Sequence, residues 1–410
     1  MALEGNMIIA QSGGPTTVIN AGVQGAVEEA MKHSEIKEIY AAHNSILGVL
    51  KEEIFDLRKE DIEDIKGLSM TPAAALGSSR YKIKTEEEIK KIFNIFKKYN
   101  IRYFFYSGGN DSMDTADKIN KLAAEENYDI RVMGIPKTID NDLAHTDHTP
   151  GYGSVIKYLS TMVMEAGKDT EAMYTIDTVN IIEAMGRNAG WIAAGTALAH
   201  RTEEDAPHII LLPEVPFNRE RFVDKVKETL DKFKRAVIVV SEGTKHPDGT
   251  YIAEQKGEFS KDSFGHKQLG GAALFIKNII ETDVKVKARF AIPSTIQRTG
   301  MHFASKTDVD EAYLAGKSAV QKAVEGVSGY MITFKRVSDN PYKIEIDMAK
   351  LSDVANDEKP LPEEWITEDG FFVTKDFYNY ALPLIQGEAP IRIKDGLPSY
   401  IRFKKHWVKL

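Results

Sequence analysis

The chain has 410 residues, more than one typical domain, and its 42% hydrophobic and 28% charged residues are typical of a globular protein. A formal charge of −8 argues against nucleic-acid binding, and the absence of cysteine excludes disulfides, thiolate metal sites and cysteine nucleophiles. No apolar run is long enough for a transmembrane helix and no secretory signal is visible, so we expect a cytoplasmic protein without a membrane partner.

The first predicted unit is a strand, a glycine turn and a helix. Residues 6–11 are apolar enough for a buried strand, residues 12–17 form a glycine-rich turn, and apolar residues recur at helical spacing over 18–31. In such a unit Gly13 lets the backbone approach an anion at the helix N-terminus. Further along the chain, a second turn of small residues ends in Arg80.

A second unit of the same kind starts at the aromatic strand 103–106. The turn that follows contains Gly109, Asn110 and Asp111, and a helical pattern opens at Met113. Backbone N–H groups of a glycine turn before a helix face an anion at the helix N-terminus. The unit therefore predicts a second phosphate-binding turn.

The most informative stretch follows the apolar residues 131–133. The strand stops at a proline, and two carboxylates, Asp140 and Asp142, stand two residues apart. In an extended or tightly turned segment they can aim at one small volume, where one takes a proton while the other holds a metal. Lys137 adds a positive charge beside them. The same residue types also suit a polar turn that caps a helix, so the stretch alone leaves both readings open.

The second half of the chain continues the alternation of strands and helices. A helix at about 155–167 and a strand at 178–183 precede Met185, Gly186 and Arg187, and a strand at 235–240 ends before Glu242. Residues 244–268 are polar without a clear period, which is typical of a mobile loop. The remaining expected elements are a half-exposed strand at 285–292, a helix at 309–324 and a strand at 330–334.

The last part of the chain, from about residue 354, is rich in Pro, Trp and Tyr and ends with basic residues. It carries no motif. Three roles remain open for it: a cap on the fold, a dimer contact, or a cover over the site.

Seven short segments, in order, together resemble the phosphofructokinase family, and its pyrophosphate-dependent branch more than its ATP-dependent one. The likeness runs from about residue 7 to about residue 348. Any one segment is weak evidence, whereas all seven in family order are a specific signal. The segments are Ser12-Gly13-Gly14-Pro15, Leu76-Gly77-Ser78-Ser79-Arg80, Gly108-Gly109-Asn110-Asp111-Ser112, residues 136–142, Met185-Gly186-Arg187, Ser241-Glu242-Gly243 and Gln297-Arg298.

The resemblance implies an α/β fold with two Rossmann-like, three-layer αβα domains and mainly parallel sheets. Residues 1–148, with about 299–350, would form the phosphoryl-donor domain, 149–298 the fructose 6-phosphate domain, and 351–410 an extension of unknown role. The implied reaction is reversible, Mg²⁺-dependent phosphoryl transfer from pyrophosphate to fructose 6-phosphate, a step of glycolysis and gluconeogenesis. Because subunits share the sugar-phosphate site in this family, a homodimer or homotetramer is expected.

The resemblance also implies residue roles. Asp140 would take the proton of the C1 hydroxyl, while Arg80, Asp111 and Lys137 complete the catalytic set. Gly13 and Gly109 would bind pyrophosphate through their backbones, and Asn110, Asp111 and Asp142 would hold Mg²⁺. The family's residues that bind fructose 6-phosphate are matched by Thr138, Asp140, Met185, Gly186, Arg187, Glu242, Arg289, Thr295 and Arg298, of which Arg289 would reach in from a neighbouring subunit.

Two positions favour pyrophosphate as the donor. ATP-dependent members have glycine in place of Asp111 and of Lys137; a carboxylate at the first position repels a third phosphate, and a lysine at the second stabilises a phosphate leaving group. Two departures from the family concern other contacts. Asn110 replaces a metal-binding aspartate, and Thr178 and Thr295 replace an arginine and a histidine that many ATP-dependent members have.

Three other functions stay open at this stage. The donor is ATP in one of them, and the second is a kinase of NAD or lipid type, which also carries a similar glycine loop. The third is a non-catalytic regulatory subunit, which only Asn110 favours.

Overall fold

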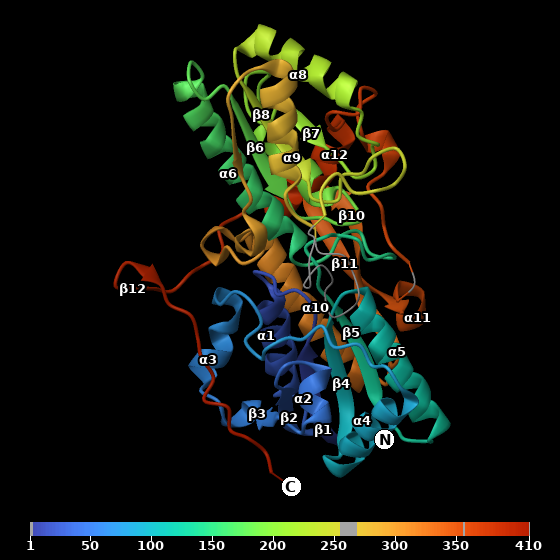
Figure 1. Ribbon diagram of the computed structural model, residues 1–410. Coiled ribbons are helices and arrows are strands. Elements are labelled where there is room, and N and C mark those ends of the chain that lie inside the picture. Colours follow the sequence, from blue (N-terminus) through green and yellow to red (C-terminus); the bar gives the residue numbers. More distant parts are fainter. Residues whose placement is uncertain (1–2, 255–268, 356, 410) are drawn as a thin grey trace.

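Two sheets with helices on both faces form the protein, whose computed structural model describes residues 3–254, 269–355 and 357–409 (Figure 1). Most neighbouring strands pair in parallel, while β11 and β3 are antiparallel edges of the larger sheet. The α/β class with mainly parallel sheets is thereby confirmed. In spatial order the first sheet contains β11 (Tyr342–Lys350), β10 (Tyr330–Asp339), β5 (Arg131–Pro136), β4 (Ile101–Gly108), β1 (Gly5–Gln11), β2 (Ile36–Ala42) and β3 (Ile54–Asp56), and the second contains β7 (Ile209–Leu211), β8 (Ala236–Ser241), β6 (Val179–Ala184) and β9 (Ala288–Ala291).

Each sheet is the middle of three layers, because successive side chains of a strand point to opposite faces. In β1, Ile8 packs into one apolar cluster and its neighbour Ile9 into another. The first cluster lies under α4 (Glu86–Lys98) and α5 (Asn110–Glu125), and the second under α1 (Ile19–Ala30) and α10 (Lys306–Val324). The second sheet is covered on one face by α6 (Tyr152–Met173), α7 (Trp191–Gly195) and α12 (Lys375–Ala381) and on the other by α8 (Arg219–Phe233) and α9 (Ala272–Ile279).

Helices α1 and α10 approach at backbone distance through glycine. A Cβ added to Gly25 would lie 2.0 Å from the carbonyl oxygen of Tyr313, and one added to Gly316 would lie 1.8 Å from that of Gly22. Any larger side chain would therefore force the helices apart. This close contact positions α1, the helix that follows the first glycine turn.

Several element boundaries differ from those expected from sequence. Helix α5 begins at Asn110 rather than at residue 113, because Gly109 is its N-cap and the polar first turn shows no apolar period. Helix α6 is longer than expected, and β9 covers only part of 285–292. Strand β10 continues to residue 339 and pairs with β11, which was not predicted although Tyr342, Ile344, Ile346 and Met348 alternate with charged residues, the pattern of a half-exposed strand. Of the loop expected at 244–268, residues 255–268 lie outside the described part of the chain.

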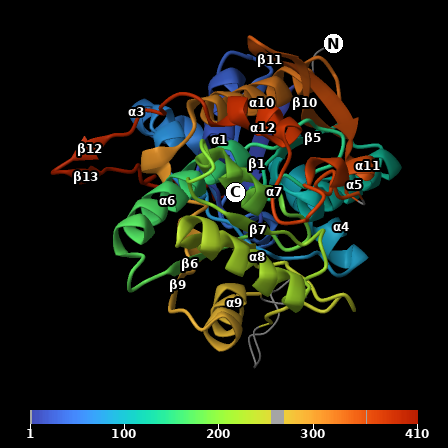
Figure 2. The same ribbon diagram turned by 90° about the horizontal axis from the view of Figure 1, so that it is seen from above.

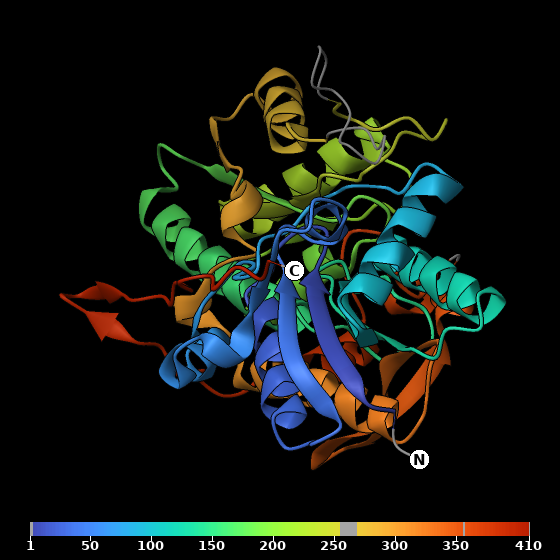
Figure 3. The same cartoon turned by 90° about the horizontal axis from the view of Figure 1, so that it is seen from below.

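The C-terminal segment, residues 351–410, contacts both sheets. Phe377 and Tyr380 of α12 belong to the apolar cluster of the second sheet, whereas Phe403 packs into a cluster of the first. Between them the chain forms a hairpin that projects from the body, as the side, top and bottom views show (Figures 1, 2 and 3). The segment and the earlier loops also contain short elements: α2 (Ile46–Leu50), α3 (Ile62–Lys66), α11 (Leu351–Val354), β12 (Ile393–Lys394) and β13 (Leu397–Pro398). Among the helices described, none combines the length and the apolar character that a bilayer crossing requires.

The loop between β5 and α6, residues 137–151 (the β5–α6 loop), is fixed by a buried histidine. His148 Nδ1 lies 2.8 Å from Asp147 Oδ1, and its Nε2 lies 2.8 Å from Glu311 Oε2 on α10. Burial lowers the pKa of His148, but the two carboxylates outweigh it and raise the pKa to about 9.

We expect this histidine to make stability depend on pH. Because the pKa of His148 is higher in the folded than in the unfolded chain, its contribution is complete below about pH 6.5 and is lost as the pH rises through about 9. The loss amounts to roughly 3 kcal/mol of unfolding free energy. Urea unfolding of the wild type and of His148→Gln at a series of pH values measures it, and the gap between the two should narrow as the pH rises. A gap that is constant with pH would contradict the charged state of His148.

Candidate active site

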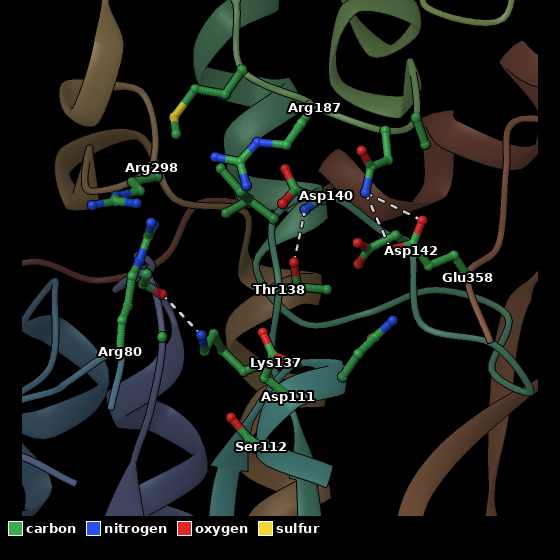
Figure 4. A pocket seen from close by; sticks show the side chains of 18 of the residues that line it. Arg80, Asp111, Ser112, Lys137, Thr138, Asp140, Asp142, Arg187, Arg298 and Glu358 are labelled. Carbon is green, nitrogen blue, oxygen red and sulfur yellow. Dashed lines mark hydrogen bonds between the residues drawn. The ribbon is translucent and has the colours of Figure 1, made fainter. Parts of the chain in front are cut away.

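A cleft of about 450 Å³ lies where the carboxyl ends of the two sheets' strands face each other (Figure 4). The turns after β1, β4 and β5 line it from the first sheet, and those after β6 and β8 from the second. This is the expected place for a ligand in open α/β sheets. Its polar lining comes from residues far apart in sequence, including Arg80, Asp111, Lys137, Asp140, Asp142, Arg187, Glu242 and Arg298.

The N-terminus of α5 opens into this cleft. Gly109 is the N-cap, and Asn110 and Asp111 form the first turn, whose N–H groups have no partner within a helix. With the helix dipole, these donors favour a bound anion. Asp111 is 39% exposed and its carboxylate lies 3.8 Å from Lys82 Nζ, so a negative group stands beside the anion site.

Lys137 is a buried cation in the wall between the two glycine turns. Its Nζ donates a hydrogen bond to the carbonyl oxygen of Gly14 at 2.9 Å. Burial, with the nearby charges of Arg298 and Arg80, lowers the pKa of Lys137 to about 7. A phosphate group entering the cleft would supply the missing negative charge and hold the lysine protonated.

Asp140 and Asp142 are both half-buried, in different electrostatic surroundings. Burial raises the pKa of Asp140, and the charges of Arg187 and Lys137 oppose this rise. Asp142 is farther from the cations: burial raises its pKa to about 7, with the neighbouring Asp140 and Glu358 carboxylates adding to the effect. Two neighbouring carboxylates whose surroundings shift their pKa values differently suit an acid–base role for one of them.

The side of the cleft formed by the second sheet supplies another acid, Glu242, and the arginines Arg187 and Arg298. Glu242 accepts a hydrogen bond from the N–H of Gly186 at 3.3 Å, and burial together with Asp140 raises its pKa to about 7. Arg298 links the two halves of the cleft, since a Cβ added to Gly14 would lie 2.7 Å from its guanidinium. Its carbonyl oxygen also accepts from the hydroxyl of Thr17 at 3.1 Å.

Most of the residues selected from sequence meet in this cleft, and three do not line it. Gly186 lies behind Glu242, Arg289 of β9 forms an ion pair with Asp177, and Thr295 is exposed beyond β9. The residues that do line the cleft are Gly13, Arg80, Gly109, Asn110, Asp111, Lys137, Thr138, Asp140, Asp142, Met185, Arg187, Glu242 and Arg298.

Glu358, which no sequence motif indicates, also lines the cleft. Its two carboxylate oxygens accept from the side-chain amide of Asn188 at 3.1 and 3.2 Å, so the C-terminal segment closes one side of the site (Figure 4). The C-terminal segment carries no motif, so only its position in the fold shows that it lines the cleft. Of the three roles left open for it, covering the site is therefore one that it takes.

The cleft offers oxygen ligands for a hard cation. Asn110 Oδ1 is buried and finds no hydrogen-bond partner among the residues that the structure describes. Asp111 and Asp142 add carboxylates to the same lining. The described residues contain no group of three or more His, Cys, Asp or Glu side chains close enough to hold a metal by themselves. Such a set suits Mg²⁺, which keeps several waters and binds substrate phosphates besides one or two carboxylates.

Comparison with known proteins agrees with this geometry. Residues 6–321 match the model of the family described as phosphofructokinase. The chain is 43% identical to the pyrophosphate–fructose 6-phosphate 1-phosphotransferase of Halomonas elongata, over 98% of this chain and 97% of the relative. Its identity to the enzyme of that name from Xanthomonas campestris is 44%, over 98% and 96%. The crystal structure of pyrophosphate-dependent phosphofructokinase from Marinobacter aquaeolei superposes with a TM-score of 0.91 at 41% identity, covering 99% of this chain and 98% of that one. The chain belongs to the phosphofructokinase family.

Proposed function

We propose that the protein transfers a phosphoryl group from pyrophosphate to the C1 hydroxyl of fructose 6-phosphate, giving fructose 1,6-bisphosphate and phosphate. The observation that carries this proposal is the position of the half-buried Asp140 in the cleft among four cationic side chains, Arg187, Lys137, Arg298 and Arg80. Phosphoryl transfer needs this combination of a base beside the acceptor and positive charge around the moving group. The names of the relatives from Halomonas elongata and Xanthomonas campestris support the same pair of substrates.

In this proposal Asp140 accepts the proton of the C1 hydroxyl as the oxygen bonds to phosphorus. Partial burial raises the pKa of Asp140, which makes its carboxylate a stronger base than one in water and favours acceptance of this proton. Lys137, Arg80 and the backbone near Gly13 and Gly109 stabilise charge on the transferred group and on the leaving phosphate. Thr138, Met185, Gly186, Arg187, Glu242 and Arg298 bind the sugar phosphate.

We also propose Mg²⁺ as the metal of this site, with Asn110, Asp111 and Asp142 as the residues that hold it. The unpartnered amide oxygen of Asn110 and the two carboxylates supply the oxygen ligands that this ion prefers. When bound, the ion neutralises charge on the pyrophosphate oxygens.

A donor comparison tests the proposal. Fructose 1,6-bisphosphate formation is measured with Mg²⁺ and either pyrophosphate or ATP at equal concentrations. We expect pyrophosphate to support turnover and ATP to support little. Preference for ATP would overturn the assignment of the donor, and activity with neither would favour a regulatory subunit or a different acceptor.

Asp111 is expected to select the donor. Its carboxylate stands at the N-terminus of α5, where a third phosphate would lie, and we expect Asp111→Gly to raise the rate with ATP relative to that with pyrophosphate by ~10-fold or more. The effect is moderate because the partly exposed carboxylate is screened by water. Rates with both donors measure the ratio, and Asp114→Gly on the same helix is the control. An unchanged ratio would remove Asp111 from donor selection.

We further propose a homodimer or homotetramer in which Arg289 and Thr295 complete the site of a second copy. Both residues lie outside their own chain's cleft, near the exposed apolar side chains of Phe290, Ile292 and Ile296. Exposed apolar groups of this kind are typical of a contact surface. Light scattering measures the assembly, and a monomer that is fully active would contradict this part of the proposal.

A further inference from the structure

We propose that Tyr380, in the C-terminal segment, is a positioning residue for the reaction: through the side chain of Asn141 it holds the β5–α6 loop that carries Asp140 and Asp142. The inference rests on the proposed function for its kinetic readout. It gives a role to part of the C-terminal segment that no motif identified.

The contact between the loop and Tyr380 is buried and hydrogen-bonded on both sides. Asn141 is fully buried, and its Nδ2 donates to the hydroxyl of Tyr380 at 2.8 Å. That hydroxyl in turn donates to the carbonyl oxygen of Asp147 at 2.8 Å. The single phenol oxygen of Tyr380 therefore joins two positions of the loop that are six residues apart.

Asn141 is also tied within the loop, and its backbone conformation is special. Its Oδ1 accepts from the N–H of Thr149 at 3.0 Å, and its φ of 55° lies in the left-handed region that Asn tolerates better than most residues. Since Asn141 stands between the two carboxylates, holding its side chain fixes the peptide planes on both sides of it. A shift of about 1 Å at a reacting group lowers a rate by about 100-fold, so such a tie is of direct consequence for the chemistry.

The rest of the C-terminal segment holds the same loop from a second side. The N–H of Lys359 donates to the carbonyl oxygen of Asp142 at 2.8 Å, and its Nζ donates to those of Thr146 and Asp147 at 3.1 and 2.7 Å. Glu358 forms an antiparallel bridge with Leu143. The loop is thus paired along its edge with the segment whose next helix, α12, carries Tyr380.

Tyr380 is itself firmly placed. Its carbonyl oxygen accepts from the guanidinium of Arg336 on β10 at 2.9 Å, and its ring packs with centroid distances of 5.4 Å to Trp191 and 5.0 Å to Trp365. An anchor with these contacts moves little, so its hydroxyl is a fixed point for the loop.

The first test compares two tyrosines of the same helix. Tyr380→Phe removes only the hydroxyl and leaves the buried Nδ2 of Asn141 without its acceptor. We expect kcat to fall by ~10–100-fold with the KM values of both substrates within ~3-fold. Tyr378→Phe is the matched control, because its hydroxyl donates to the carbonyl oxygens of Ala197 and His200, outside the loop. It should leave kcat unchanged. Equal kinetics of the two variants would overturn the proposal.

The second test is a double-mutant cycle. Asn141→Gly removes the side chain while glycine keeps the left-handed backbone. If Tyr380 acts through Asn141, adding Tyr380→Phe to Asn141→Gly slows the enzyme no further. Losses that simply multiply would show that Tyr380 acts independently of Asn141, and would overturn the proposal.

The third test needs no activity, so it separates this inference from the proposed function. Hydrogen exchange of amides in residues 139–149 is followed by mass spectrometry, and Tyr380→Phe should accelerate it by ~10-fold or more relative to the wild type. Tyr378→Phe should not. A wild type without pyrophosphate-dependent turnover would refute the proposed function and leave this result standing, whereas unchanged exchange in Tyr380→Phe would refute the positioning role.

Discussion

Asp140→Asn is expected to lower kcat with pyrophosphate by ~10³-fold or more. The amide keeps the shape of the side chain but cannot accept the proton of the C1 hydroxyl, and general base catalysis is typically worth 10²–10⁴-fold. The half-buried carboxylate also interacts with Arg187 and Lys137, so its loss removes a negative charge from the centre of the cationic site. The KM values of both substrates should change by less than ~5-fold, because the phosphate-binding cations remain. Initial rates of fructose 1,6-bisphosphate formation measure both quantities.

Asp114→Asn is the control for this substitution. Asp114 lies on α5 and is paired with Lys118 one turn along the helix. The same chemical change there should leave kcat within ~2-fold of the wild type. Asp140→Asn with more than a tenth of wild-type activity would contradict the assignment of Asp140 as the base.

Lys137→Met is expected to lower kcat/KM for pyrophosphate by ~10²–10³-fold, because it removes a buried charge that stabilises the transferred and leaving phosphate groups. The same variant should unfold at a higher temperature than the wild type. Burial and the nearby arginines lower the pKa of Lys137 from 10.5 to about 7, so at any pH below 10.5 this lysine costs the folded state free energy, either as a buried charge or through loss of its proton. Methionine fills a similar volume without that cost.

The two readouts of Lys137→Met together distinguish a functional charge from a structural one. Replacing a lysine needed for folding would lower activity and stability together. Replacing a lysine retained for catalysis lowers activity and raises stability. Lys118→Met, at an exposed ion pair on α5, should change neither quantity much. A fall in the unfolding temperature of Lys137→Met would contradict this explanation.

The local signals of the sequence were sufficient to predict the strand–turn–helix units and the residues at their ends. Gly13 and Gly109 stand in glycine turns after apolar strands, and Asp140 follows a strand that ends at a proline. All three lie at the carboxyl ends of parallel strands, and the structure brings them into one cleft. The parallel order of strands makes this convergence a consequence of the fold. Lys137 was selected for its charge, yet its burial and lowered pKa come from tertiary packing that no local pattern contains.

What the sequence did not predict depends on contacts between distant segments. Glu358 reaches the cleft only because the chain, after β11, returns to the carboxyl ends of the strands. Arg289 and Thr295 were selected through the family resemblance, and their place outside the cleft of their own chain depends on the short strand β9. Neither hydrophobic period nor turn chemistry encodes such long-range contacts.

The tie between Asn141 and Tyr380 joins residues separated by 239 positions in the chain. A ribosome that adds about 5–20 residues per second needs on the order of tens of seconds to cover that distance. During this interval the strands β1 to β5 of the first sheet can pair, but the loop that carries the two carboxylates still lacks its anchor. The nascent chain thus acquires the turns after these strands early, and the anchor of the β5–α6 loop only near the end of synthesis.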